Sequence, residues 1–433
     1  ALILVENRAM PEVVIAGLLH GLGNKELELK AKEKFGVEVT ALLSGIDEVK
    51  RIKFQNKKLE ADALRRIILT TIEDVRVILI QLANKIDNLQ TTNLLPKEDQ
   101  KRIAEEVLEF YAPLAYRLGL EKMKAQLETS AFKILNPKFY QEISNYLEDS
   151  QEQREQDVNA AIKLIQKVCA DQINILKIKG RTKQIYSIYK KIVDRKVPLK
   201  EQYDLFGVRV LVSEVKDCYS LLGLLHEKFE SVEGRLKDYI ANPKPNGYRS
   251  IHTGIKFPNG KVVEVQIRTS EMDEIAEEGI AAHWRYKGLS SEKLFEKKVA
   301  WLRGVLDLQK DLEDKDFLEA AKVDVFGDNI YCYTPKGDIK ELPKGSTILD
   351  FAFLIHERIG ATTVGGRING KFVPLRTELN QGDIIEIITN KNQRPRRTWI
   401  KIVKSSKAKQ KIRKYLKEFE SLPALHYHQL KPE

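Results

Sequence analysis

Apolar residues recur at three- and four-residue steps through the first third of the chain, as in IILTTIEDVRVILIQLANKI and IAEEVLEFYAPLAYRLGL. This spacing places the apolar side chains along one face of a helix. Strand-like alternation is nearly absent in this part of the sequence. The pattern therefore predicts an all-helical domain over residues 1–150.

The pattern then becomes mixed. A long helical segment, VNAAIKLIQKVCADQI, precedes apolar runs typical of strands: INILKIKG, YDLFGVRVLVS, IHTGIKF and KVVEVQIRT. Helical segments alternate with them: GRTKQIYSIYKKI, DCYSLLGLLHEKF and MDEIAEEGIAAHWRYK. This alternation predicts a mixed α/β domain over residues 151–290.

The run KVVEVQIRT alternates strictly between apolar and polar residues. The apolar row comprises Val263, Val265 and Ile267, and the polar row comprises Glu264, Gln266 and Arg268. Such a strand is usually buried on one face and solvated on the other. A carboxylate, an amide and a guanidinium in one row could equally form one wall of a binding site, so the strand alone leaves both interpretations open.

The last third divides into three parts. A charged helical connector is predicted over residues 291–322, and a small sheet-and-helix module over 323–390, with hairpin turns at Pro335-Lys336-Gly337 and Asn369-Gly370 and one helix. A basic helical segment follows over residues 391–433, and its first 27 residues hold twelve Lys or Arg and no Asp or Glu. This run is either a solvated helix face or a contact for nucleic-acid phosphates.

Composition narrows the class of protein. The net charge of +11 makes a polyanionic partner plausible. The three cysteines, Cys169, Cys218 and Cys332, lie far apart, which argues against a disulfide scaffold or a zinc ribbon. Apolar runs are too short to span a membrane and no signal peptide is visible. We therefore expect a cytoplasmic protein with structural cysteines and no membrane partner.

Two stretches of the mixed domain carry clustered cations. IKGRTKQIYSIYKK is predicted to place Gly180, Arg181, Lys183, Ser187 and Lys191 at the mouth of a helix, where backbone N–H groups and cations favour polyphosphate. The spacing differs from that of a P-loop. GRLKDYIANPKPNGYRSIHT adds further polar and aromatic groups: Arg235, Lys237, Tyr239, Lys244, Asn246, Tyr248, Arg249, Ser250 and His252. Aromatic rings among cations in an irregular loop suit nucleotide recognition.

Two carboxylates could support phosphoryl transfer. Asp204 stands at the head of the strand YDLFGVRVLV, where it either caps a turn or binds a metal. Asp204 and Glu264 could share Mg2+ if their strands are neighbours, and Glu264 could also accept a proton from an attacking hydroxyl.

Taken together, the motifs IKGRTKQIYSIYKK, YDLFGVRV, RLKDYIANPKPNGYRSIHT, EVQIRT and EIAEEGIAAHWRYK resemble the synthetase domain of the long RelA/SpoT (Rel) proteins. DNIYCYTPKGD, DFAFLIHERIG, GRINGKFVPL and GDIIEIIT resemble their TGS domain, and the N-terminal helices resemble their HD hydrolase domain. The resemblance implies a multidomain α and α+β protein, with a helical HD-type domain, a polymerase-β-like nucleotidyltransferase domain and a β-grasp-like TGS domain.

The resemblance also implies an activity of the stringent response: ATP gives its β,γ-pyrophosphate to the 3′-hydroxyl of GDP or GTP, making ppGpp or pppGpp. Asp204 and Glu264 would bind Mg2+, and Glu264 would deprotonate the hydroxyl. Gln266 would place the acceptor, and Arg181 would be a further catalytic residue. The residues implied for ATP are Arg181, Lys183, Ser187, Lys191, Arg209, Arg235 and Lys237, and those for GDP or GTP are Lys244, Asn246, Tyr248, His252 and Gln266. Arg209 would stack on adenine. Strict alternation sets it on the opposite face from Asp204, so both reach the site only through a strand end or a bulge at Gly207.

The hydrolase motifs depart from the family. That site holds Mn2+ with two His and two Asp; here His20 matches a ligand, but Gly21 and Asn84 replace both aspartates, while Asn88 and Thr91 keep nucleotide-contact positions. Neutral side chains lack the anionic oxygens that a hard cation prefers. We therefore expect a degenerate hydrolase domain that binds no Mn2+, with His20 as a satisfied helix residue. Arg235-Leu236-Lys237-Asp238 nevertheless follows the RxKD form of bifunctional members.

In the TGS-like module, His356 matches the histidine that meets the acceptor end of uncharged tRNA on the ribosome; otherwise it would be a packing residue. We also expect residues of the natural chain before Ala1 and after Glu433. The alternatives to a synthetase are a non-catalytic tRNA- and ribosome-binding nucleotide sensor, and a bifunctional synthetase/hydrolase. The sequence predicts neither the oligomeric state nor the preference between GDP and GTP.

Overall fold

The computed structural model describes residues 1–21, 25–50, 57–170, 172–196, 198–202, 205–244, 246–258, 260–279, 296, 299–300, 302–303 and 329–420. The chain forms two compact units, one of residues 1–51 and 69–301 and the other of residues 52–68 and 302–433. The connector expected at 291–322 lies almost wholly outside the described residues. Within the described part, no helix is long and apolar enough to cross a membrane.

The N-terminal part is helical, as predicted. Its helices are α1 (Leu2–Glu6), α2 (Pro11–Leu19), α3 (Lys25–Lys50), α4 (Lys57–Glu73), α5 (Arg76–Thr91), α6 (Lys97–Glu106), α7 (Ala112–Leu118), α8 (Glu121–Leu135) and α9 (Pro137–Asp149). Helix α3 is broken at Gly36, whose φ is +86°. The run VILIQLA of α5 is buried at every position, as expected for a helix at the centre of a helical domain.

A mixed sheet follows. Its six strands are β1 (Ile175–Thr182), β2 (Phe206–Val212), β3 (Glu230–Ser231), β4 (Lys237–Asp238), β5 (Ile251–Lys256) and β6 (Val262–Thr269). The spatial order is β1-β2-β6-β5-β3, with β4 also paired to β5; β2 and β6 are parallel, and the other pairs are antiparallel. The parallel pair brings the segment after residue 204 beside KVVEVQIRT.

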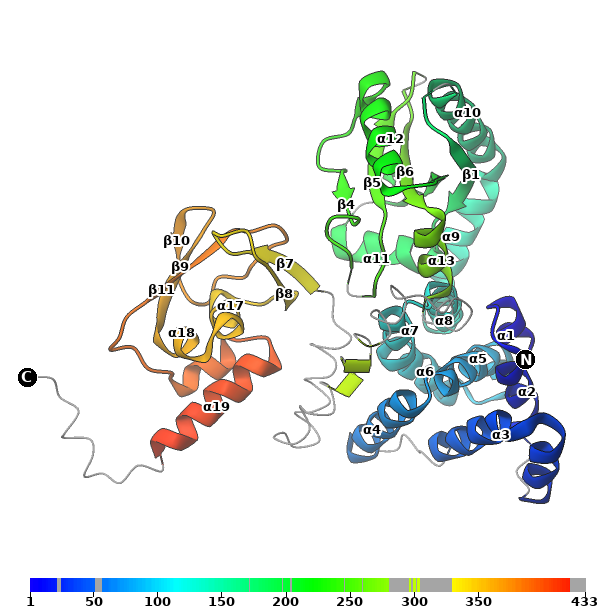
Figure 1. Cartoon of the computed structure of the whole chain (residues 1–433), viewed down its shortest axis with the longest axis horizontal. Coiled ribbons are helices and arrows are strands. Elements are labelled where there is room, and N and C mark those ends of the chain that lie inside the picture. Colours follow the sequence, from blue (N-terminus) through cyan, green and yellow to red (C-terminus); the bar gives the residue numbers. More distant parts are fainter. Residues whose placement is uncertain are drawn as a thin grey trace, which may run out of the picture. The chain divides into compact units, whose positions relative to one another are not determined.

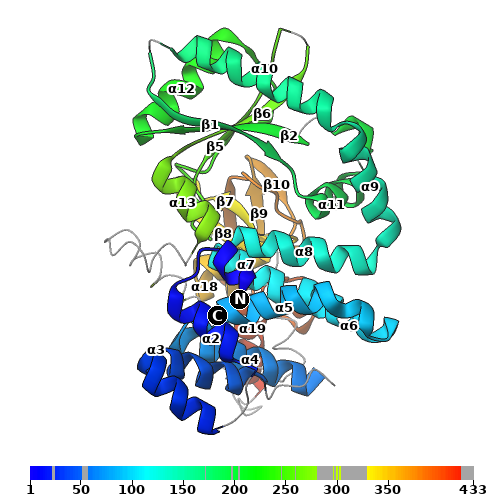
Figure 2. The ribbon, with the colours of Figure 1, turned by 90° about the vertical axis from the view of Figure 1, so that its right-hand side faces the viewer.

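Four helices accompany this sheet: α10 (Gln151–Cys169), α11 (Ile185–Arg195), α12 (Val215–Lys228) and α13 (Ser270–Glu278). Figures 1 and 2 show α10 and α12 on one face of the sheet and α13 on the other. The apolar row of β6 packs with Val208 and Val210 of β2 against α10 and α12. The predicted core row is therefore confirmed, and the polar row of β6 lies on the α13 face.

The second unit contains β7 (Asn329–Tyr333), β8 (Ile339–Pro343), α17 (Ile348–Ile355), α18 (Glu357–Thr362), β9 (Thr363–Ile368), β10 (Lys371–Val373), β11 (Ile385–Thr389) and α19 (Ser406–Glu420). Both predicted hairpins are present, and the Asn369-Gly370 turn has φ values of +51° and +84°. The prediction of one helix is wrong. His356 adopts an extended conformation between α17 and α18 and starts a second helix.

The basic segment packs onto the small module through α19. Leu349 and Phe353 of α17 share a buried cluster with Trp399, Val403 and Ile412. The Asp350 carboxylate, 1% exposed, accepts hydrogen bonds from the backbone N–H groups of Lys404 (3.0 Å) and Ser405 (2.7 Å), as well as from Thr347. One face of the basic segment therefore belongs to a folded core.

Asp350→Asn should lower the free energy of unfolding of this unit by about 3 kcal/mol, because an amide NH2 would face buried N–H donors and leave them unpaired. The measurement is denaturant unfolding followed by Trp399 fluorescence in a chain with Trp284→Phe and Trp301→Phe. Exposed Glu378 provides the matched control, Glu378→Gln. An equal midpoint in the two variants would contradict the role of Asp350.

The three cysteines are free and buried. Burial raises the pKa of Cys169 and Cys218 to about 11 and that of Cys332 to about 12. They are therefore thiols at neutral pH, which agrees with the expected structural role.

Candidate active site

The strand register gathers polar residues from distant parts of the chain on the α13 face of the sheet. Arg181 of β1 lies opposite Gly207 of β2, which pairs with Glu264 of β6. The next row runs through Lys179, Arg209, Gln266, His252 and Lys237, on five different strands. Paired residues point to the same face. Cations from β1, β2 and β4 therefore flank the carboxylate and amide of β6.

Glu264 is held by two neighbours. Its Oε1 lies 2.9 Å from His252 Nδ1 and accepts a hydrogen bond from Gln266 Nε2 at 3.1 Å. Burial alone would raise the pKa of Glu264, but the hydrogen bond from His252, with that from Gln266 and the charge of Arg181, holds the pKa well below its usual value. Glu264 is therefore an ionised carboxylate, suited to a cation.

His252 connects Glu264 to the aromatic loop. The Tyr248 hydroxyl lies 2.7 Å from His252 Nε2, so the network assigns the ring proton to Nδ1, where it faces Glu264. Burial lowers the pKa of His252, although the Glu264 carboxylate opposes this, and the imidazole is neutral. Lys244 Nζ lies 4.7 Å from the ring centroid of Tyr239 and 4.8 Å from that of Tyr248.

Asn246 lies in this loop but is 2% exposed. Its Oδ1 accepts a hydrogen bond from the Tyr248 backbone N–H at 3.1 Å, and its Nδ2 lies 3.5 Å from Glu121 Oε1 of α8. In this structure Asn246 shapes the loop that carries Tyr248. The expectation that it contacts the acceptor nucleotide remains a prediction.

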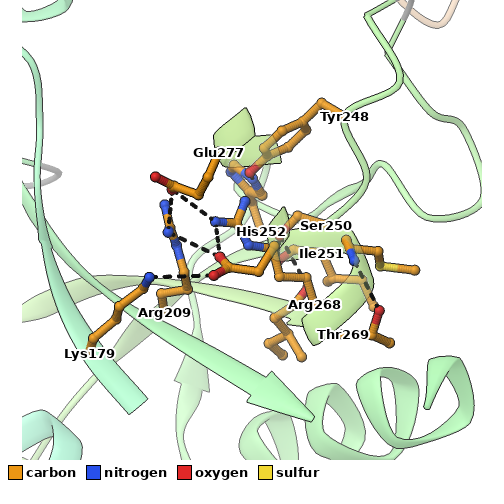
Figure 3. Close-up of polar contacts among 12 residues, drawn as sticks. Lys179, Arg209, Tyr248, Ser250, Ile251, His252, Arg268, Thr269 and Glu277 are labelled. Atoms are coloured by element: carbon orange, nitrogen blue, oxygen red, sulfur yellow. Dashed lines mark hydrogen bonds and ion pairs between the residues drawn. The ribbon is translucent and has the colours of Figure 1, made fainter. Parts of the chain in front are cut away.

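Arg209 and Arg268 converge on α13 (Figure 3). Arg209 Nη1 lies 3.1 Å from Asp273 Oδ1 and 2.6 Å from Glu277 Oε1, while Arg268 Nη2 also contacts Asp273 Oδ1. Lys179 Nζ lies 3.4 Å from Asp273 Oδ2. Arg268, the last residue of the polar row of β6, is thus a buried ion-pair residue at 1% exposure.

The bulge considered at Gly207 is absent, since the β2–β6 register runs without a shift from Gly207 to Val212. Arg209 reaches the site face by ordinary alternation. Asp204 lies outside the described residues and precedes β2. The condition for a shared metal, that the two strands are neighbours, is met.

The cationic segment IKGRTKQIYSIYKK differs in part from the prediction. Gly180 and Arg181 belong to strand β1 and not to a turn at the helix mouth. Lys183 follows the strand, and its backbone N–H bonds to the Leu205 carbonyl oxygen at 2.9 Å. Ser187 and Lys191 lie one turn apart on α11. The segment therefore divides its polar groups between a strand edge and a helix.

The RxKD segment lies beside β5. Lys237 of β4 pairs with His252, and Arg235 packs against Gly254, where an added Cβ would lie 3.2 Å from Arg235 Cβ. Asp238 accepts hydrogen bonds from the backbone N–H groups of Ile240 and Ala241, both at 2.9 Å. Asp238 is therefore a loop-capping residue, while Arg235 and Lys237 lie near the site.

In the helical part, His20 ends α2, and its Nδ1 lies 2.8 Å from the Gly17 carbonyl oxygen. Asn84, Asn88 and Thr91 follow one face of α5, and the Thr91 hydroxyl donates to the Asp87 carbonyl oxygen at 3.1 Å. Gly21 is the last residue described before a gap. Within the described residues, no group of three His, Cys, Asp or Glu side chains could hold a metal ion.

His356 is exposed and caps α18, with its Nδ1 accepting a hydrogen bond from the Arg358 backbone N–H at 3.1 Å. The alternative of a packed histidine is therefore wrong.

The acidic residues of α13 were missed from the sequence. EMDEIAEEG places Asp273 and Glu277 four residues apart, on one helical face directly after the strand EVQIRT. That spacing was the available signal, but which cations they meet depends on the strand order.

Comparison with known proteins assigns the domains. A model of the region found in RelA / SpoT proteins matches residues 180–291, an HD domain model matches residues 1–121, and a TGS domain model matches residues 330–389. These matches, with the site on the sheet, define a multidomain chain of HD, synthetase-type and TGS domains. The chain belongs to the RelA/SpoT (Rel) family, as its motifs predicted.

Among curated relatives, a GTP pyrophosphokinase from Myxococcus xanthus is 40% identical over 413 residues, covering 94% of this chain and 55% of that protein. The bifunctional (p)ppGpp synthase/hydrolase SpoT of Escherichia coli (strain K12) is 38% identical over 426 residues, covering 97% of this chain and 61% of that protein. The chain thus spans little more than half the length of these relatives. The small alarmone synthetase 1 from Bacillus subtilis, solved with its product pppGpp, is 25% identical, covers 39% of this chain and 96% of its own, and has a TM-score of 0.27.

Proposed function

We propose that the chain transfers the β,γ-pyrophosphate of ATP to the 3′-hydroxyl of GDP or GTP. The observation that carries the proposal is the face of the sheet on which Arg181, Arg209 and Lys237 flank the ionised Glu264 carboxylate. Cations and an ionised carboxylate suit a reaction that moves a highly charged phosphoryl group. Relatives named GTP pyrophosphokinase support the same reaction.

In this reaction the acceptor 3′-oxygen bonds to the β-phosphorus of ATP, the bond from that phosphorus to the α,β-bridging oxygen breaks, and AMP leaves. Glu264 accepts the hydroxyl proton, and Gln266 positions the acceptor. The Gln266 Oε1 atom is buried and has no hydrogen-bond partner among the described residues, so it can accept a hydrogen bond from the nucleotide. Tyr248 stacks on guanine, and His252 keeps Tyr248 and Glu264 in register.

On the donor side, we propose that Arg181, Lys183, Ser187 and Lys191 bind the ATP phosphates and that Arg209 stacks on adenine. Lys237 and Arg235 add positive charge where the leaving phosphate develops negative charge. Glu264, as an ionised oxygen ligand next to the start of β2, fits Mg2+, with Asp204 as the second ligand. When bound, Mg2+ would neutralise phosphate charge in the transition state.

The test is incubation of the protein with ATP, GDP and Mg2+, followed by chromatography for AMP and ppGpp. Equimolar AMP and ppGpp are the expected result. If neither forms, with or without ribosomes and uncharged tRNA, the synthetase proposal is wrong and the alternative of a non-catalytic nucleotide sensor is favoured.

We propose in addition that the HD domain is degenerate and does not hydrolyse ppGpp. His20 bonds to its own helix, and the two aspartate positions hold Gly21 and Asn84. We expect no Mn2+-dependent release of pyrophosphate from ppGpp above the background without protein, with the Escherichia coli SpoT protein as the positive control. Robust turnover would instead favour a bifunctional synthetase/hydrolase, the activity given in the name of the SpoT protein.

The TGS domain and α19 are proposed to contact the acceptor end of uncharged tRNA on the ribosome. Exposed His356 and the lysines and arginines of the segment from Lys391 to Lys417 support this proposal, because accessible cations neutralise RNA phosphates. Binding should then weaken steeply as the salt concentration rises.

A further inference from the structure

Helix α13 presents two carboxylates to the sheet, Asp273 and Glu277, one turn apart. Together they contact cations from three strands: Lys179 of β1, Arg209 of β2 and Arg268 of β6. Figure 3 shows the side chains of Lys179, Arg209, Arg268 and Glu277 converging. Neither carboxylate belongs to the rows of residues that the proposed reaction uses directly.

The contacts on Arg209 restrain one edge of its guanidinium. Both carboxylates meet the same nitrogen, Nη1, at 3.1 Å and 2.6 Å, and the side chain is 10% exposed. A guanidinium fixed through an edge nitrogen has a set orientation of its flat faces, which stacking on an aromatic ring requires. Glu277 makes the shorter contact, and its own side chain is 41% exposed.

The contacts on Arg268 extend to the aromatic loop. Its Nη2 contacts Asp273 and lies 3.5 Å from Glu277 Oε1. Its guanidinium carbon lies 5.8 Å from the ring centroid of Tyr248, within the range of a cation–π contact. Arg268 is 1% exposed, so its charge depends on the nearby carboxylates for compensation. Asp273 thus contacts one arginine beside Lys179 and another beside Tyr248.

We propose that Asp273 and Glu277 are positioning residues that hold the two base-stacking groups of the synthetase, Glu277 acting on Arg209 and Asp273 on both Arg209 and the Arg268–Tyr248 pair. The inference rests on the proposed function, since it assigns adenine to Arg209 and guanine to Tyr248. Glu277 lies 2.6 Å from Arg209 but 3.5 Å from Arg268, so it controls chiefly the affinity for ATP, whereas Asp273 controls the affinity for both nucleotides.

The experiment compares Glu277→Gln, Asp273→Asn and Asp273→Glu with Glu274→Gln, a matched control on the exposed side of the same helix. KM for ATP, KM for GDP and kcat are measured for each, with binding of α,β-methylene-ATP by calorimetry and the thermal unfolding midpoint. Loss of one charge-assisted hydrogen bond corresponds to about a tenfold change in affinity.

For Glu277→Gln we expect KM for ATP and the Kd of α,β-methylene-ATP to rise about tenfold, with KM for GDP within twofold of wild type. For Asp273→Asn we expect both KM values to rise about tenfold, and Asp273→Glu should recover most of the loss. Glu274→Gln should match wild type. The Glu277 side chain is 41% exposed, so its replacement by an amide should be compatible with folding.

Two results would overturn the inference: unchanged nucleotide affinity in both amide variants of an active enzyme, or a fall in kcat and unfolding midpoint with neither KM altered, which is the signature of a purely structural ion pair. A wild-type protein that makes no ppGpp would instead refute the proposed function. Calorimetric binding of α,β-methylene-ATP would still test the contact of Glu277 with the donor site in that case.

Discussion

Glu264→Gln is expected to lower the rate of ppGpp synthesis by about three orders of magnitude, which corresponds to about 4 kcal/mol of transition-state stabilisation. The amide has the same shape, so His252 and Gln266 keep a neighbour in place. What is lost is the negative charge and the capacity to accept a proton. Because the pKa of Glu264 is held below its usual value, the carboxylate is ionised in wild type throughout the neutral range.

The measurement is single-turnover formation of AMP and ppGpp at saturating ATP and GDP, so that binding defects do not obscure the chemical step. Glu230→Gln is the control, since Glu230 lies on β3 of the same sheet, is 73% exposed and pairs only with the surface residue Lys256 among the contacts described. Near wild-type turnover by Glu264→Gln would exclude Glu264 as base and metal ligand alike.

Gly207→Ala is expected to reduce kcat/KM by about 10²-fold, although the new group is a single methyl. A Cβ at this position would lie 2.7 Å from the Glu264 carbonyl oxygen, which is backbone and cannot turn aside. β2 and β6 must therefore shift, and Glu264 moves relative to the cations of β1. Overpacking of this kind also destabilises a fold by about 1–3 kcal/mol.

Gly223→Ala provides the comparison, because Gly223 lies in α12 with nothing within 4 Å of the added Cβ. Alanine there should stabilise the helix by about 0.5–1 kcal/mol and leave synthesis unchanged. Steady-state kinetics and thermal unfolding of both variants decide the matter. Full activity of Gly207→Ala would mean that the β2–β6 spacing does not position Glu264.

The alternation in KVVEVQIRT correctly predicts the polar and apolar rows of β6, because strand alternation is a local property of the sequence. The sequence also identified the cations that the sheet brings together, since clustered Arg and Lys beside aromatic loop residues are visible in any register. It could not pair Arg209 with Asp273 and Glu277. Those contacts arise from the parallel crossover that sets β2 beside β6, followed by the turn into α13. Local sequence patterns determine neither the strand order nor the rotation of the helix about its axis.

The errors have equally specific causes. The bulge expected at Gly207 follows only if Asp204 belongs to the strand, whereas β2 begins at Phe206. The apolar periodicity of DFAFLIHERIG predicts one continuous helix and does not reveal that His356 caps a new one. The burial of Asn246 against Tyr248 and Glu121 is likewise a property of the fold that the loop sequence does not reveal, while its contact with the acceptor nucleotide remains a prediction.

The hydrogen bonds from Lys404 and Ser405 to Asp350 bear on how this part of the protein can be isolated. The TGS domain model ends at residue 389, but a fragment cut there would lose Trp399, Val403 and Ile412 and leave Leu349 and Phe353 of α17 facing water. Such a fragment would be prone to aggregate. An expression boundary beyond residue 420 keeps α19 whole and yields the unit that would be soluble enough for RNA-binding measurements.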